Sequence, residues 1–288
     1  MNEIQNVIEV NNLSFSYTSV PFLTNISFDV RRGEIFGFLG PSGAGKSTLQ
    51  KVLTGLCTNY TGSAQILGVE SRKHKNDFYE KIGVDFEFPS LYEKMTAREN
   101  LKYFASLYSG EKRDIDELLS DVGLLSHGDK KVKEFSKGMK SRLNFIKALV
   151  HNPELLFLDE PTSGLDPNNA RIMKEMILAE REKGKTIIIT THNMIDATEL
   201  CDRVVFIVDG QTKALDTPRN FIMSKGAIRV TYTYIENDME CTGSCQLDEI
   251  KDDELLNLII SENRLKSIHS TEPTLNDIFI EITGAKLC

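Results

Sequence analysis

No stretch of this 288-residue sequence stays apolar for long enough to cross a lipid bilayer. The longest apolar run, residues 204–208, is far shorter than the ~18 residues that a membrane-spanning helix requires. The first ten residues, MNEIQNVIEV, also lack the basic region and apolar core of a signal peptide. An integral membrane protein is therefore excluded, and we expect a soluble chain that stays in the cytoplasm.

Basic residues and cysteines are also in short supply. The chain has 34 Lys and Arg against 42 Asp and Glu, a net charge of −8, which argues against a nucleic-acid-binding protein because phosphate contacts usually require a basic surface. A local basic patch stays possible within that average. The odd, scattered set of five cysteines indicates free thiols in a reducing compartment: Cys57, Cys201, Cys241, Cys245 and Cys288.

What the chain does contain is a glycine-rich segment, GPSGAGKS at residues 40–47, that fits the phosphate-binding pattern G-x-x-x-x-G-K-[ST]. An apolar run precedes it and an amphipathic run through Leu56 follows it, so the context is strand, loop and helix. The alternative, without any nucleotide binding, is a glycine-rich turn that merely starts a helix. We expect Lys46 to reach the β- and γ-phosphates and Ser47 to bind Mg²⁺. The expected nucleotide-binding residues are Gly40, Pro41, Ser42, Gly43, Ala44, Gly45, Lys46, Ser47 and Thr48.

A second feature is the sequence LLFLDE, in which four apolar residues run into Asp159 and Glu160. This pattern predicts a buried strand that delivers two carboxylates to its carboxyl end, where ligands lie in open α/β sheets. Asp159 is then placed to hold Mg²⁺, and Glu160 to polarise a water for attack on the γ-phosphate. The alternative is a strand end capped by solvated acids.

The order of hydrophobic patterns predicts an α/β fold with a largely parallel sheet. Alternating strands before residue 70 predict an N-terminal antiparallel β subdomain, and helical periodicity over about residues 91–150 predicts an inserted helical subdomain. We place an ATP-binding domain at residues 1–218 and a small α/β accessory domain at residues 219–288. Within the latter we expect a strand from Ile228, an exposed loop at 236–254, and a helix capped by Thr274 and Asp277.

A third segment, Ser136-Lys137-Gly138-Met139, opens a helical pattern between the first two features. Taken together in this order, the motifs resemble those of the ATP-binding-cassette (ABC) ATPases, over about residues 5–215. In that resemblance this segment stands at the family's signature, His192 at its switch histidine, and Tyr17 at the aromatic that stacks on adenine. Tyr17 and His192 also have purely structural alternatives. The family's D-loop corresponds to Ser163, Gly164, Leu165 and Asp166.

Two positions depart from the family pattern. Glu87 stands where the family has the glutamine of its glutamine loop, and a carboxylate there still suits Mg²⁺ as a hard oxygen ligand. In the signature, usually written LSGGQ, Lys137 replaces a glycine and Met139 replaces the glutamine. Both changes, and the sequence after Pro273, resemble the exporter branch in which ATPase and permease are separate chains.

The resemblance implies a P-loop NTPase that hydrolyses ATP with Mg²⁺ held by Ser47, Glu87 and Asp159. Lys46, Glu160 and His192 would be catalytic. It further implies a dimer, homomeric or with a second cassette, in which the signature of one chain covers ATP on the other. The chain would then be the motor of an exporter, bound peripherally to a separate permease at the cytoplasmic face of the membrane. The alternative is a soluble ABC ATPase that acts on ribosomes or DNA, which the acidic composition disfavours.

Overall fold

A computed structural model describes residues 5–224, 229–236, 239–271 and 273–285. The chain forms two compact units, one of Met1–Thr217 with Ala285–Cys288 and one of Pro218–Gly284. Cys288, which the sequence predicts to be a free thiol, lies outside the described residues, as does Ile228. The other four cysteines are free, as predicted.

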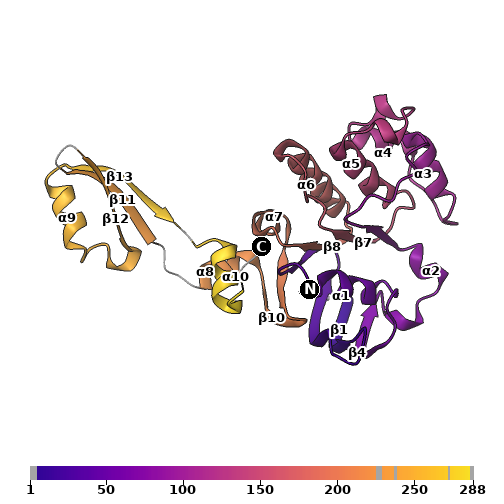
Figure 1. Cartoon of the computed structure of the whole chain (residues 1–288), viewed down its shortest axis with the longest axis horizontal. Coiled ribbons are helices and arrows are strands. Elements are labelled where there is room, and N and C mark those ends of the chain that lie inside the picture. The colour runs from indigo at the N-terminus through magenta and orange to yellow at the C-terminus, as the bar shows by residue number, and fades with distance from the viewer. Residues whose placement is uncertain (1–4, 225–228, 237–238, 272, 286–288) are drawn as a thin grey trace. The chain divides into compact units, whose positions relative to one another are not determined.

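The larger unit is built on a six-stranded sheet in the order β10-β9-β3-β8-β7-β6 (Figure 1). The five strands from β9 to β6 are parallel, and β10 adds an antiparallel edge that the sequence patterns did not predict. Strands β3, β8 and β9 are buried along their whole length, which explains their near-continuous apolar sequences. The bounds are β3 Ile35–Leu39, β6 Ile82–Asp85, β7 Leu155–Asp159, β8 Thr186–Thr191, β9 Arg203–Val208 and β10 Gln211–Asp216.

A second, antiparallel sheet in the order β2-β1-β4-β5 confirms the predicted N-terminal β subdomain. Its alternating residues turn one face inward, where they form one apolar cluster with Phe36 and Phe38 of β3. Its strands are β1 Asn6–Phe15, β2 Leu23–Arg31, β4 Tyr60–Ile66 and β5 Val69–Glu70.

The helix after the glycine-rich loop, α1 (Lys46–Leu53), is shorter than predicted. It ends at Thr54 because Gly55 adopts φ +77, a left-handed conformation that stops a helix. Leu56 is therefore 60% exposed, and its placement on the buried face of this helix was wrong. The other α-helices of the larger unit outside the insert are α2 Asn76–Tyr79, α6 Pro167–Glu182 and α7 Met194–Leu200.

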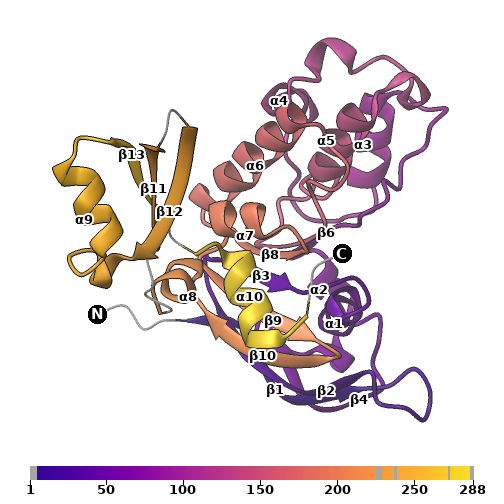
Figure 2. The same cartoon turned by 60° about the vertical axis from the view of Figure 1, so that its left-hand side comes forward.

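Three helices that come between β6 and β7 in the sequence lie together, as the helical periodicity predicted (Figure 2). They are α3 (Ala97–Ala105), α4 (Ile115–Asp121) and α5 (Lys137–Lys147). Each begins at a side chain that accepts hydrogen bonds from the first turn: Thr96, Asp114 and Ser136 respectively.

The smaller unit carries an antiparallel sheet in the order β12-β11-β13. The exposed loop expected over residues 236–254 was wrong, since β12 pairs with β11 along its length despite having few apolar residues. Gly243 leaves room for the Tyr232 ring, which a side chain there would meet at 2.4 Å. The predicted capping box of Thr274 and Asp277 is present. The bounds are α8 Pro218–Ser224, β11 Arg229–Glu236, β12 Met239–Gln246, α9 Glu254–Ser261, β13 Leu265–Thr271 and α10 Leu275–Thr283.

Candidate active site

The candidate site lies at the carboxyl edge of the six-stranded sheet, where four neighbouring strands end in the order β3, β8, β7 and β6. The glycine-rich loop follows β3 and His192 follows β8. Asp159 is the last residue of β7, with Glu160 directly after it, and Glu87 lies two residues beyond β6. Because parallel strands end at one edge, four separate parts of the sequence meet there.

The glycine-rich loop holds Lys46 over its own backbone. Lys46 Nζ donates to the carbonyl oxygens of Gly40 at 2.6 Å and Pro41 at 3.1 Å. Gly45 has φ +107, which only glycine adopts readily, and it precedes the first residue of α1. Burial lowers the pKa of Lys46, while the negative charges of Glu160 and other nearby carboxylates oppose that shift. The ammonium is thus pre-positioned and largely shielded from water, at 7% exposure.

Asp159 gathers hydroxyl groups from two neighbouring elements. Ser47 Oγ donates to Asp159 Oδ1 at 3.3 Å, and Thr190 Oγ1 donates to the same oxygen. The register places Asp159 directly beside Thr190, which explains that contact. A carboxylate and a serine hydroxyl on one side of the pocket form a set of hard oxygen donors.

Glu160 has a strained backbone conformation, and three side chains hold its carboxylate. Its φ is +50, a left-handed value that is uncommon for residues other than glycine and asparagine. Its Oε1 lies 2.9 Å from His192 Nδ1 and 4.0 Å from Lys46 Nζ, and its Oε2 accepts from Thr191 Oγ1 at 3.2 Å. The carboxylates of the two neighbouring residues therefore have separate hydrogen-bond partners, because Asp159 is held by Ser47 and Thr190 instead.

These groups line one open pocket of about 260 Å³. It brings together most of the predicted nucleotide and metal residues, and three carboxylates face a single ammonium. That excess of negative charge favours a divalent cation over a bare anion. The lining residues are Phe22, Ser42, Gly43, Gly45, Lys46, Ser47, Thr48, Glu87, Asp159, Glu160 and His192.

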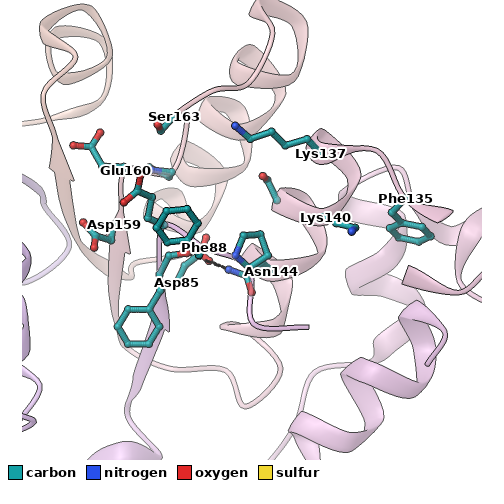
Figure 3. Close-up of a pocket in the computed structure, with 14 residues that line it drawn as sticks. Asp85, Phe88, Phe135, Lys137, Lys140, Asn144, Asp159, Glu160 and Ser163 are labelled. Atoms are coloured by element: carbon teal, nitrogen blue, oxygen red, sulfur yellow. Dashed lines mark hydrogen bonds between the residues drawn. The ribbon is translucent and has the colours of Figure 1, made fainter. Parts of the chain in front are cut away.

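None of the signature residues lines this pocket; Lys137 lies against the D-loop of the same chain and Gly138 against helix α6. Lys137 lines a neighbouring cavity of about 350 Å³ with Glu160 and Ser163, and its amine points toward Ser163 (Figure 3). A side chain at Gly164 would meet Lys137 Nζ at 2.0 Å, and one at Gly138 would meet Asn169 at 2.5 Å. Ser136, Gly138 and Met139 do not line the 260 Å³ pocket.

The D-loop itself leads into helix α6. Asp166 caps that helix by accepting from the backbone N–H groups of Asn168 and Asn169. A hydrogen bond from the Asn169 side chain, followed by those from the two backbone groups, holds the pKa of Asp166 below its usual range. Leu165 N–H donates to Thr162 O at 3.2 Å, which closes the turn.

Tyr17 lies near the glycine-rich loop but is not among the pocket residues. It is 57% exposed, its hydroxyl lies 3.1 Å from Thr48 Oγ1, and its ring packs edge-on against Phe22. The sequence patterns missed Phe22, which lines the pocket, and the two threonines Thr190 and Thr191, which hold the carboxylates. Hydroxyl side chains at the end of a strand that is otherwise isoleucine-rich were the available signal for the threonines.

Within the part of the chain that the structure describes, no helix is both long enough and apolar enough to cross a bilayer. The family model for "ABC transporter" matches residues 23–163. A fluoroquinolones export ATP-binding protein of Mycobacterium tuberculosis is 46% identical over 285 residues, covering 98% of this chain and 94% of that protein. Nod factor export ATP-binding protein I of Rhizobium meliloti is 33% identical over 297 residues, covering 97% and 89%.

Solved structures agree in fold. One described as the ATP binding subunit of an ABC transporter superposes with a TM-score of 0.69 at 31% identity, covering 76% of this chain and 93% of that one. The cbiO1 protein of Clostridium perfringens, described as part of the ABC transporter complex cbiONQ, also gives a TM-score of 0.69, at 26% identity and with 76% and 92% covered. The predicted fold class and family are thus confirmed, and the chain belongs to the ATP-hydrolysing, ATP-binding subunits of the ABC transporter family.

Proposed function

We propose that this chain is the motor subunit of an exporter, and that it hydrolyses ATP in the pocket formed by residues 40–48, Asp159, Glu160 and His192. The observation that carries the proposal is the convergence of Lys46, Ser47, Asp159, Glu160 and His192 on one open pocket from three neighbouring strands. This is the set of groups that phosphoryl transfer to water requires.

Each of these side chains has a distinct task. Lys46 neutralises charge on the β- and γ-phosphates, because its ammonium is held at the mouth of the loop by carbonyls that the phosphates can replace. Glu160 orients and deprotonates the attacking water, and His192 holds that carboxylate through the 2.9 Å contact while its other ring nitrogen faces the γ-phosphate. Tyr17 packs beside the loop and contributes a face for adenine.

Ser47, Asp159 and Glu87 fit a magnesium ion. The donor set is a hydroxyl and two carboxylates, and the 3.3 Å contact between Ser47 and Asp159 shows that two of these groups already converge. Bound there, Mg²⁺ would supply charge neutralisation for the triphosphate.

A second copy of the chain completes the site. Ser136, Lys137, Gly138 and Met139 lie at the N-terminal end of α5, outside the pocket of their own chain, where free N–H groups favour an anion. We propose that these residues cover ATP bound to a partner chain, so that ATP holds two subunits together and hydrolysis releases them. The contact of Lys137 with Gly164 ties this surface to the D-loop.

A separate membrane permease has a candidate docking groove on this chain. A groove of about 310 Å³ lies between the helical insert and the sheet, and apolar side chains dominate it. Leu56, Tyr79, Phe86 and Leu107 line it although each is at least 39% exposed, which is unusual for large apolar residues in one place. Phe86 is adjacent to Glu87, so an apolar permease helix seated there would contact the loop that enters the ATP pocket.

Export is the proposed direction, and the inner face of the membrane the proposed location, because the two relatives described above are both named for export. The relative at 46% identity makes fluoroquinolones the first cargo to assay. The test compares the accumulation of a fluoroquinolone in cells with and without the chain and its candidate permease, and export should lower that accumulation. Equal accumulation would contradict that choice of cargo.

The variant Glu160→Gln tests the catalytic assignment. It keeps the shape of the side chain but removes the base, so we expect ATP binding to persist while kcat falls on the order of 10²–10⁴-fold. A stable, ATP-dependent dimer in gel filtration is the second expected result. Glu182→Gln, on the exposed face of α6, is the matched control. Near-normal turnover in Glu160→Gln would show that another group activates the water.

The permease groove is tested by Leu107→Glu, which places a charge among apolar residues without disturbing the core, since Leu107 is 61% exposed. The chain is coexpressed with a candidate permease, and copurification from detergent-solubilised membranes is measured. We expect Leu107→Glu to lose the association and Leu125→Glu, 45% exposed elsewhere in the insert, to keep it. Equal recovery of both variants would place the interface elsewhere.

A further inference from the structure

A buried carboxylate lies at the root of the loop that carries Glu87. Asp85 is the last residue of β6, two positions before Glu87, and only 6% of it is exposed. An acid group in that position must find hydrogen-bond donors inside the protein, because burying it unpaired is costly. The elements that supply those donors therefore bear on what the loop can do.

The donors come from one helix, α5. Asn144, 2% exposed, donates from Nδ2 to Asp85 Oδ1, as Figure 3 shows, and lies 3.4 Å from the carbonyl oxygen of Phe86. Lys147, one turn further along, donates from Nζ to Asn144 Oδ1 at 2.6 Å and to the carbonyl oxygen of Ser90 at 3.3 Å. Two side chains of one helix thus hold both ends of the segment from 86 to 90.

The same helix carries the signature residues at its start. Helix α5 begins at Lys137 with Ser136 as its cap, seven residues before Asn144. At about 1.5 Å per residue the two points are ~10 Å apart on one rigid element. Its hydrogen bonds are continuous between them, so a displacement at Asn144 also displaces residues 136–139.

We propose that Asp85, Asn144 and Lys147 form a clamp that makes the Glu87 loop and helix α5 move as one body during ATP turnover. The inference rests on the proposed function, in which Glu87 and residues 136–139 meet nucleotide. The three side chains are positioning residues and do not touch ATP. Without the clamp, the loop can reach its place in the ATP pocket while the signature residues are elsewhere, so closure and chemistry become uncoupled.

Exchanging the two ends of the clamp tests this directly. Asn144→Asp sets two carboxylates against each other, and we expect kcat to fall about tenfold with the ATP dissociation constant within about twofold of wild type, because the ligands of the phosphates are unchanged. The double variant, Asp85→Asn with Asn144→Asp, again pairs one amide with one carboxylate beside the unchanged Lys147. We expect it to regain kcat to within about threefold of wild type.

The fall in kcat at an unchanged ATP dissociation constant separates a positioning role from a merely structural one, and hydrogen exchange supplies a second readout at the loop itself. The backbone amides of residues 86–90 should exchange faster in Asn144→Asp and return to the wild-type rate in the exchanged pair, whose melting temperature should also recover toward that of wild type. Should Asn144→Asp not fold, Lys147→Gln cuts the link to Ser90 at a half-buried position and is expected to lower kcat about threefold. Lys102→Gln, on the exposed face of α3, is the control and should match wild type.

Wild-type kcat in folded Asn144→Asp or in Lys147→Gln overturns the clamp, and so does a folded exchanged pair that stays as slow as the single variant. These outcomes are separate from a failure of the proposed function. The latter would appear as unaltered ATP affinity in Lys46→Ala or unaltered turnover in Glu160→Gln, with no reference to the clamp variants.

Discussion

The contact between His192 and Glu160 gives a prediction whose size follows from the structure. His192→Ala removes the hydrogen bond from Nδ1 to Glu160 Oε1, 2.9 Å long, and leaves the carboxylate with Thr191 Oγ1 at 3.2 Å and Lys46 Nζ at 4.0 Å. A hydrogen bond to a charged group contributes about 1.5–3 kcal/mol. The His192 side chain is 40% exposed, so the lower end applies, which corresponds to a loss of about tenfold in kcat.

Steady-state ATPase assays on His192→Ala, Thr191→Val and the double variant measure this. Thr191→Val removes the longer contact to the other carboxylate oxygen, and we expect about threefold, because a neutral hydroxyl donor contributes less. Since both side chains hold one carboxylate, the double variant should lose less than the product of the two single losses. A kcat for His192→Ala within twofold of wild type would refute the assignment, as would strict additivity.

Three further predictions concern the glycine-rich loop and the proposed magnesium site. Gly40→Ala places a Cβ 2.0 Å from the Ile207 carbonyl oxygen, so β9 must shift and the melting temperature should fall by roughly 4–10 °C. Gly110→Ala, whose Cβ would meet only the end of the Glu80 side chain at 3.3 Å, is the control and should lose less; equal melting curves would contradict the close approach at Gly40. Lys46→Ala should weaken ATP binding by more than about tenfold in a fluorescent-nucleotide titration, because the triphosphate loses its fixed ammonium. Asp159→Ala should raise the Mg²⁺ concentration for half-maximal turnover by more than about tenfold without weakening metal-free ATP binding, and an unchanged Mg²⁺ requirement would remove Asp159 from the metal site.

The sequence was most informative where local patterns determine structure. Apolar runs predicted three strands that end in polar residues, and all three are present. They lead into Asp159, into the glycine-rich loop before Lys46, and into His192. Parallel strands end at one edge, so their meeting followed without knowledge of packing. The capping box at Thr274 was equally local, since its two partners are three residues apart.

The parts that the sequence did not predict depend on contacts between distant segments. Asp85 and Asn144 are 59 residues apart, and nothing near either one indicates that α5 packs on the end of β6. Strand β12 turns only Cys241, Gly243 and Cys245 toward the core of the smaller unit, too weak an apolar stripe to predict a strand, and its pairing with β11 supplies the rest. Leu56 was misplaced because one glycine, Gly55, outweighs a favourable apolar spacing.

With the catalytic role proposed for Glu160, its left-handed backbone sets this chain's stability against its activity. Of the seven residues other than glycine with positive φ in the part of the chain that the structure describes, five are Asn or Asp; the other two are Leu67 and Glu160. Glycine at position 160 would relieve a strain of order 1 kcal/mol, and it would remove the carboxylate that faces His192. Directed evolution for heat resistance alone would thus be drawn toward replacing this residue, and a screen that scores only melting temperature would enrich inactive proteins. Any engineering of this subunit needs selection for turnover at every round.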